Sequence, residues 1–67
     1  MIEVLLNGKP REVNEGETLA GLLKALDLDP RWVVAEVNGE VVDRHRFGEV
    51  SLSGGDRLEL VRAVAGG

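Results

Sequence analysis

The amino-terminal residues alternate between two faces with a period of two, which is typical of a half-buried β-strand. One face carries Ile2, Val4 and Leu6, and the other carries Met1, Glu3 and Leu5. Asn7 and Gly8 follow at once, and this dipeptide is the strongest short signal for a two-residue hairpin turn. Pro10 stands at the start of the returning segment, where its missing N–H does least harm. The sequence therefore predicts a β-hairpin that returns through residues 10–13.

A helix is predicted over residues 18–26. Its apolar side chains recur at the spacing of one helical face, at Leu19, Leu22, Leu23 and Leu26. Thr18 is the predicted N-cap, because its hydroxyl can accept a hydrogen bond from a free backbone N–H of the first turn. We expect the segment to end at Asp29, since the residue before a proline, here Pro30, is disfavoured in helical conformation.

Strand patterns return in the second half of the chain. Residues 32–37 alternate with Val33, Ala35 and Val37 on one face, and Asn38 and Gly39 predict a second turn into Val41 and Val42. Residues 43–47 are too polar for a central strand, so we expect an irregular crossover from which Phe47 or Val50 reaches the core. A tight turn at residues 54–56 then leads into a last strand over 57–61, with Leu58 and Leu60 on one face.

This order of elements predicts an α+β fold of the ubiquitin-like β-grasp type, with one helix packed on a mixed sheet of four to five strands. We expect the first and last strands to pair in parallel at the centre of the sheet, since both alternate most regularly. Residues 1–62 form the predicted domain. Residues 63–67 are expected to be a flexible tail, because they carry too little apolar surface to be held down.

The length and composition of the chain argue against several classes of function. The chain of 67 residues leaves no room for a catalytic cleft, and its net charge of −4 opposes the phosphate contacts of a nucleic-acid binder. No apolar stretch approaches the roughly 20 residues that span a bilayer, and no secretion signal is recognisable. The absence of cysteine favours a cytoplasmic protein without disulfides or thiolate metal sites. We expect no membrane partner, no bound metal or cofactor, and a monomer when free.

Catalytic groups are scarce. His45 is the single histidine and stands in a charged run, which favours a solvated surface position over a functional role. Ser51 and Ser53 belong to no recognisable nucleophile motif. The glycines fit neither spacing of a phosphate-binding loop. The protein is therefore expected not to be an enzyme in isolation.

The carboxyl end, which closes on Gly66 and Gly67, is the remaining candidate for chemistry. Two residues without Cβ allow an extended tail to thread a narrow channel and leave the terminal acyl carbon unshielded. A carboxylate is inert to nucleophiles until one oxygen becomes a leaving group. The tail therefore implies a partner that activates it with ATP and stabilises the charge that develops.

Features spread over the whole chain resemble the ThiS sulfur carriers of thiamine biosynthesis. They are Thr18 and Leu19 opening a leucine-rich helix, Val37, Asn38 and Gly39 followed by Val41 and Val42, Arg44 in the crossover, Gly55 and Asp56 before the last strand, and the ending Ala63, Val64, Ala65, Gly66 and Gly67. Together these features are specific, whereas each alone is common.

The resemblance implies that the carboxylate of Gly67 is adenylated by a ThiF-type enzyme, which uses ATP and Mg²⁺. A cysteine desulfurase then supplies sulfur for a terminal thiocarboxylate. The acceptor in that family is thiazole synthase, ThiG. Ala65 and Gly66 are the residues by which partners are expected to recognise the tail.

Three other interpretations stay open at this point. The small subunit of molybdopterin synthase shares the fold and the ending, although its members are usually longer. A carrier for tRNA thiolation, or a protein modifier, uses the same tail. A plain β-grasp interaction module belongs to another class, and it predicts that removing Gly67 leaves every partner affinity unchanged.

The outer face of the sheet is the hypothetical docking surface for partner enzymes. It would contain Leu5, Val34, Glu59 and Val61, flanked by Arg57 and Arg62. The motivation is that Leu5 and Val61 are expected to point away from the helix, although scattered exposed aliphatic residues are normal. Charge reversal at both arginines should weaken the complex with the activating enzyme. For Trp32 we expect a partly buried structural role.

Overall fold

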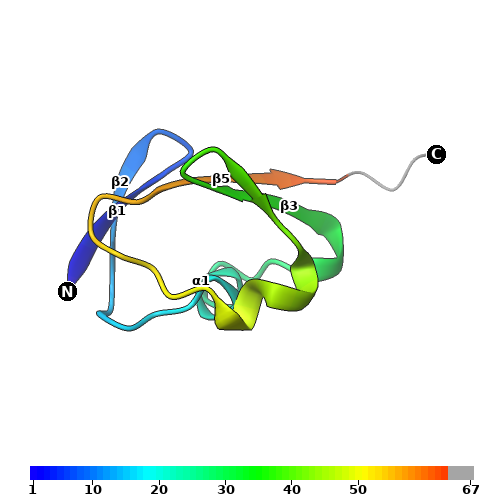
Figure 1. Ribbon diagram of the computed structural model, residues 1–67, viewed down its shortest axis with the longest axis horizontal. Helices are drawn as coiled ribbons and strands as arrows, with labels where there is room; N and C mark the ends of the chain where they lie inside the picture. Colours follow the sequence, from blue (N-terminus) through cyan, green and yellow to red (C-terminus); the bar gives the residue numbers. More distant parts are fainter. Residues whose placement is uncertain (64–67) are drawn as a thin grey trace.

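The computed structural model describes residues 1–63. Five strands form one sheet, and a short helix covers one face of it (Figure 1). The elements in chain order are β1 (Ile2–Leu6), β2 (Lys9–Val13), α1 (Leu19–Ala25), the 3₁₀ helix η1 (Pro30–Trp32), β3 (Val33–Val37), β4 (Glu40–Val42), the 3₁₀ helix η2 (Arg44–Glu49) and β5 (Arg57–Arg62). This arrangement confirms the predicted β-grasp fold, with five strands.

The strand order is β2-β1-β5-β3-β4, which places the last strand at the centre of the sheet. β1 pairs with β5 in parallel, with Leu5 beside Arg57 and Leu6 beside Leu58. β3 pairs with β5 antiparallel along all five of its residues. The predicted parallel pairing of the first and last strands is therefore confirmed.

Both predicted hairpin turns are present, and each uses an asparagine and a glycine in the left-handed region. Asn7 and Gly8 have φ of 51° and 82°, and Asn38 and Gly39 have φ of 53° and 87°. Asparagine and glycine adopt positive φ more readily than other residues, which is why this dipeptide suits a turn whose twist matches the strands. The side chains of both asparagines also accept hydrogen bonds from the backbone of β5.

The core lies between the sheet and α1. It is aliphatic apart from one aromatic ring, and its buried members are Val4, Val13, Leu19, Leu22, Leu23, Val33, Ala35, Phe47, Leu52, Leu58 and Leu60. Leu26, the last residue of the predicted helical stripe, packs against this cluster from the C-cap position of α1. The inward residues of the strand patterns and of the helical stripe thus meet in one layer, as predicted.

The helix occupies nearly the predicted residues 18–26, with Thr18 as its N-cap, but Asp29 and Pro30 do not end it as expected. α1 stops at Ala25, well before Asp29 and Pro30, because Asp27 has a φ of +60° and reverses the chain. The N–H of Leu28 donates to the carbonyl of Leu23, and that of Asp27 donates to Lys24. These two bonds form a Schellman motif, here with aspartate in place of the usual glycine.

The crossover over residues 43–47 was expected to be irregular, and this expectation was wrong. The crossover forms η2, whose first turn is capped by Asp43 accepting from the N–H of His45 at 2.8 Å. Either Phe47 or Val50 was expected to reach the core, and Phe47 does so, since it is only 2% exposed. A polar segment can be helical when one apolar side chain anchors it.

Trp32 belongs to η1 rather than to the following strand, which begins at Val33. Trp32 is 47% exposed, which agrees with the partly buried position expected for it. Among residues 1–63, no helix is long and apolar enough to cross a membrane.

Candidate functional site at the end of the last strand

The central strand β5 carries the chain to its carboxyl end. Leu58 and Leu60 anchor it in the core, whereas Arg57, Glu59 and Val61 are exposed. Just after the strand, the N–H of Ala63 donates to the carbonyl of Trp32 at 2.6 Å. In Figure 1 the strand runs straight out toward one end of the molecule. The tail residues singled out in the sequence, Ala65, Gly66 and Gly67, lie outside the described residues, so their roles stay predictions.

Asn7 holds β5 from the side of β1. Its Oδ1 accepts from the N–H of Leu60 at 2.8 Å, and its Nδ2 donates to the carbonyl of the same residue at 3.2 Å. Its backbone N–H also donates to the carbonyl of Leu58 at 2.8 Å. A side-chain amide thus takes the place of a backbone peptide unit beside the strand.

Asn38 holds the opposite end of β5. Its Oδ1 accepts from the N–H of Arg57 at 2.9 Å, and its Nδ2 donates to the carboxylate of Asp56 at 3.0 Å. Sequence reasoning treated Asn7 and Asn38 only as turn residues and missed these contacts. The available signal was asparagine, rather than aspartate or glycine, at the first turn position of both hairpins.

The outer face of the sheet gathers most of the hypothetical docking residues. Val34 lies directly opposite Val61, and Leu5 lies beside Arg57. Val34 and Val61 are 46% and 58% exposed, and Val41 on the neighbouring strand, which the sequence did not single out, is 69% exposed. Glu59 lies opposite Glu36 in the same face.

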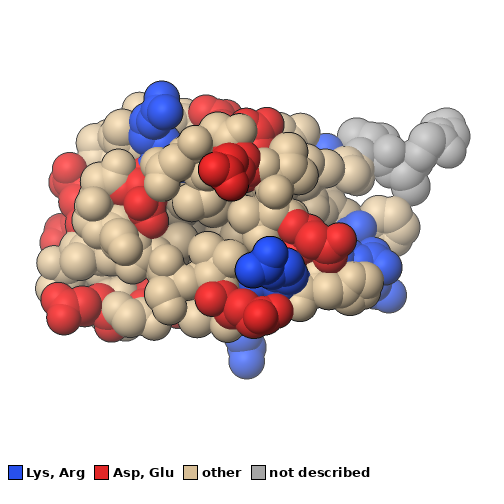
Figure 2. All heavy atoms as spheres, viewed as in Figure 1, with Lys and Arg blue, Asp and Glu red and all other residues tan. Residues whose placement is uncertain are grey.

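Arg62 does not flank this face. Successive residues of a strand point to opposite sides, so Arg62 lies on the side of Leu58 and Leu60, opposite Val33. The hypothetical docking surface is therefore divided between the two sides of the sheet. Seen as in Figure 2, acidic and basic side chains are both spread over the visible face, and some of the basic ones lie at the end of the molecule toward which β5 runs.

Within residues 1–63, the structure brings together no group of three or more metal-ligating side chains. His45 is exposed and lies 3.1 Å from the carboxylate of Asp43, as its charged surroundings indicated. In the same part of the chain, no polar or charged residue is buried.

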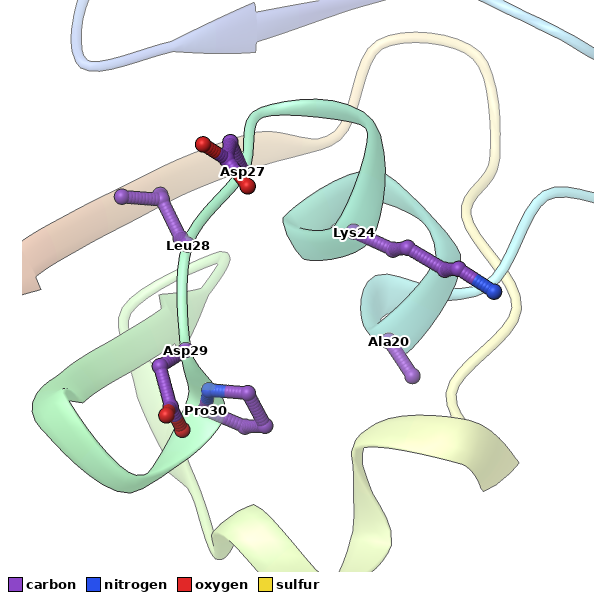
Figure 3. Close-up of a pocket in the computed structure, with 6 residues that line it drawn as sticks. All are labelled: Ala20, Lys24, Asp27, Leu28, Asp29 and Pro30. Atoms are coloured by element: carbon purple, nitrogen blue, oxygen red, sulfur yellow. The ribbon is translucent and has the colours of Figure 1, made fainter.

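Two hollows flank the loop after α1. The first, of about 440 Å³, is lined by Ala20, Lys24, Asp27, Leu28, Asp29 and Pro30 (Figure 3). In that view the amine of Lys24 points away from the loop. The second, also of about 440 Å³, reaches the end of β5 and is lined by Asp27, Leu28, Asp29, Trp32, Val33, Arg62 and Ala63.

The carboxylate of Asp29 forms hydrogen bonds within its own loop. Its carboxylate accepts from the Arg31 guanidinium at 2.8 Å and from the Arg31 N–H at 2.9 Å. The hydrogen bonds from the Arg31 side chain, which come first, and from its backbone hold the pKa of Asp29 below its ordinary value. A carboxylate stabilised in its charged form and facing solvent is poorly suited to proton transfer near neutral pH. Asp29, which lines both hollows, therefore serves the local structure of its loop.

A five-stranded mixed sheet covered by one helix, with the last strand parallel to the first at its centre, defines the class of ubiquitin-like β-grasp domains. The sequence profile of the ThiS family matches residues 4–67. The chain belongs to the ThiS family.

Known relatives agree with this assignment. The sulfur carrier protein ThiS of Bacillus subtilis is 35% identical over 63 residues, which cover 92% of this chain and 96% of that protein. The crystal structure of the thiamine biosynthesis protein ThiS from Geobacter metallireducens matches with a TM-score of 0.84 and 33% identity, covering 98% of this chain and all of that one.

A thiazole synthase of Magnetococcus marinus is 39% identical over 66 residues, or 98% of this chain. The chain spans only about a fifth of the length of that protein, and the same holds for a second thiazole synthase, from Paramagnetospirillum magneticum. A sequence similar to this chain therefore occurs within longer proteins that carry the name of the synthase.

Proposed function

We propose that this chain is a sulfur carrier for thiamine biosynthesis. The carboxylate of Gly67 is adenylated and converted to a thiocarboxylate, which donates its sulfur during thiazole synthesis. The observation that carries the proposal is the match over nearly the whole chain both to free ThiS carriers and to a segment of thiazole synthases. Since the family match extends to residue 67, it includes the group that would react.

The fold supports a carrier role. β5 is paired with β3 along nearly its whole length and with β1 at Arg57 and Leu58, and it is anchored by Leu58 and Leu60. A rigid domain can present a short tail to a partner's active site at a small entropic cost. The reaction chemistry then belongs to partners, and the chain itself is a substrate rather than an enzyme.

The chemistry proceeds in three steps. A carboxylate oxygen of Gly67 attacks the α-phosphorus of ATP, and pyrophosphate leaves. The terminal sulfur of a persulfide then attacks the acyl carbon, and AMP leaves with the bonding electron pair. A second thiol cleaves the resulting acyl disulfide, which leaves the thiocarboxylate on the chain and a disulfide on the donor side.

The partners follow from these steps. A ThiF-type enzyme would supply the ATP and Mg²⁺ site, and a cysteine desulfurase would supply the persulfide. Thiazole synthase would accept the sulfur, which the similarity to a segment of such synthases supports. The absence of cysteine from the chain suits this scheme, because the sulfur is carried on a carboxyl carbon, and it suits a cytoplasmic location.

The test is the intact mass of the chain after incubation with ATP, cysteine, a desulfurase and a ThiF-type enzyme. We expect a gain equal to the replacement of one oxygen by one sulfur. The matched control is the same chain without Gly67, which ends on Gly66 and should show no gain.

Two outcomes would count against the proposal. A mass gain in the control would place the sulfur elsewhere. No gain in the full chain, with an enzyme shown to be active on another carrier, would favour a plain interaction module. If the thiocarboxylate forms but thiazole synthase does not consume it, the carrier chemistry stands and the acceptor is a different enzyme.

A further inference from the structure

β5 extends farther than β1 does beside it. The two strands are in register at Leu5 with Arg57 and at Leu6 with Leu58. After Leu6 the chain turns away into the hairpin, while β5 continues to Arg62. Backbone groups of β5 beyond Leu58 therefore face a position where the neighbouring strand has ended.

The hydrogen-bonding direction of each β5 residue follows from its pairing with β3. Ala63 donates to Trp32, and Asn38 donates to Arg57, so the odd-numbered residues bond toward β3. Backbone groups alternate along a strand in an antiparallel ladder. Leu58, Leu60 and Arg62 consequently direct their N–H and C=O groups toward the side of β1.

Asn7 fills that position at Leu60. The N–H of Leu60 can only donate, which places Oδ1 of Asn7 against it and Nδ2 against the Leu60 carbonyl, as the two distances of 2.8 and 3.2 Å show. Leu60 is only 9% exposed. Without Asn7 its two polar groups would lose their partner in a poorly hydrated position, which is costly.

Within residues 1–63, this is the last hydrogen-bonded contact of β5 on the β1 side. Beyond it, the described part of β5 and Ala63 are held from β3, at Val61 opposite Val34 and at the bond between Ala63 and Trp32. The position of the end of β5 thus depends on its pairing with β3 and on how firmly it is fixed at Leu60.

We propose that Asn7 is a positioning residue for the C-terminal tail. Its side-chain amide extends the β1 side of the ladder by one unit and fixes the direction in which β5 delivers the reactive end to a partner. This inference rests on the proposed carrier function for its kinetic consequence, although not for its structural one. When the competent direction is only one of several populated, apparent affinity falls by the fraction that is competent.

The chain offers a matched pair of variants. Asn7→Gly and Asn38→Gly each remove a side-chain amide that bonds to the backbone of β5. Glycine tolerates the positive φ of both turn positions, so the turns themselves are preserved. The two sites differ in which end of β5 they hold: Asn7 is near the tail, and Asn38 is at the far end.

The first measurement is native-state hydrogen exchange on the free carrier. For Asn7→Gly we expect the N–H of Ala63 to exchange about tenfold faster relative to the core amide of Leu22, because local opening at the strand end becomes easier. For Asn38→Gly that ratio should stay at the wild-type value. A ratio that is equal in the two variants would overturn the proposal, since Asn7 would then act on stability alone.

The second measurement is thiocarboxylation by a ThiF-type enzyme, at a temperature where circular dichroism shows both variants folded. We expect Asn7→Gly to raise KM about three- to tenfold with kcat within about twofold, because fewer molecules present the tail correctly. Asn38→Gly should leave both constants within about twofold of wild type. Equal KM values in the two variants would contradict the kinetic part of the proposal.

A failure of the proposed carrier function can be told apart from a failure of the inference about Asn7. If the wild-type chain is not thiocarboxylated, the proposed function fails, while the exchange experiment still decides on Asn7. If Asn7→Gly does not fold, Asn7→Asp serves instead, because it keeps an oxygen for the N–H of Leu60 and lacks the donor for the carbonyl. Faster exchange at Ala63 in that variant supports the proposal, and unchanged exchange overturns it.

Discussion

At the residue scale, polar side chains complete the ends of short helices. The hydroxyl of Thr18 accepts from the N–H of Gly21 at 3.1 Å at the start of α1. Asp29 and Asp43 accept from the second residue of η1 and η2, respectively. Helices of this length leave a large share of their backbone groups without internal partners, so each cap counts.

Replacing Thr18 tests the cap directly. We expect Thr18→Ala to lower the free energy of unfolding by about 1 kcal/mol, the usual loss when an N-cap hydroxyl is removed. Thr18→Ser should retain most of the stability because it keeps the hydroxyl. The measurement is urea unfolding followed by circular dichroism, and equal midpoints for the alanine and serine variants would contradict the assignment.

At the element scale, the outer face of the β3–β5 pair contains a repulsive contact. Glu36 and Glu59 lie directly opposite each other, and like charges in that position destabilise a sheet. Arg57 lines the same shallow hollow as both glutamates, but within residues 1–63 it forms no ion pair with either of them at 4 Å or less. The pairing of Glu36 with Glu59 therefore lowers the stability of the sheet.

Neutralising one partner should relieve the repulsion. We expect Glu36→Gln to raise the free energy of unfolding by about 0.5 kcal/mol at low ionic strength. The gain should shrink in about 1 M salt, where exposed charges are screened. Glu40→Gln is the control, since Glu40 lies opposite Val37 rather than another acid, and a gain of the same size there would show that the effect reflects net charge alone.

At the scale of the whole molecule, the two arginines of the hypothetical docking surface lie on opposite sides of the sheet. Arg57 belongs to the outer face with Leu5 and Val61, whereas Arg62 lies beside the hollow that reaches Trp32 and Ala63. A combined charge reversal would therefore not tell which side a partner contacts. Single variants do so.

If the outer face meets the activating enzyme, Arg57→Glu should weaken the complex about tenfold and Arg62→Glu should change it by less than about twofold. Isothermal titration calorimetry with a ThiF-type enzyme, in a buffer of fixed ionic strength, would measure both affinities. The reverse order would move the docking surface to the side of α1. Unchanged affinity for both variants would remove these arginines from consideration.

The elements themselves could be predicted from the sequence because their signals are local. Alternation placed Val33, Ala35, Leu58 and Leu60 on the inner face, and asparagine with glycine marked both hairpins. The end of α1 was missed because Asp27 adopts a conformation for which glycine is the usual signal. The helical turn η2 was missed because its polar residues show no periodicity and one ring, Phe47, anchors it.

For the candidate site too, some residues could be predicted from the sequence and others could not. Gly66 and Gly67 could be singled out because they stand at the end of the chain, whatever the fold. The contact between Asn7 and Leu60 could not, because it joins residues 53 positions apart and exists only once β1 and β5 are in register. The sequence by itself determined the strands, the helix and the turns, since each depends on neighbouring residues, and it also carries the prediction that Gly67 is the reactive end. Only the tertiary structure decided which side of the sheet Arg62 occupies and what holds the last strand, because both depend on how distant segments pair.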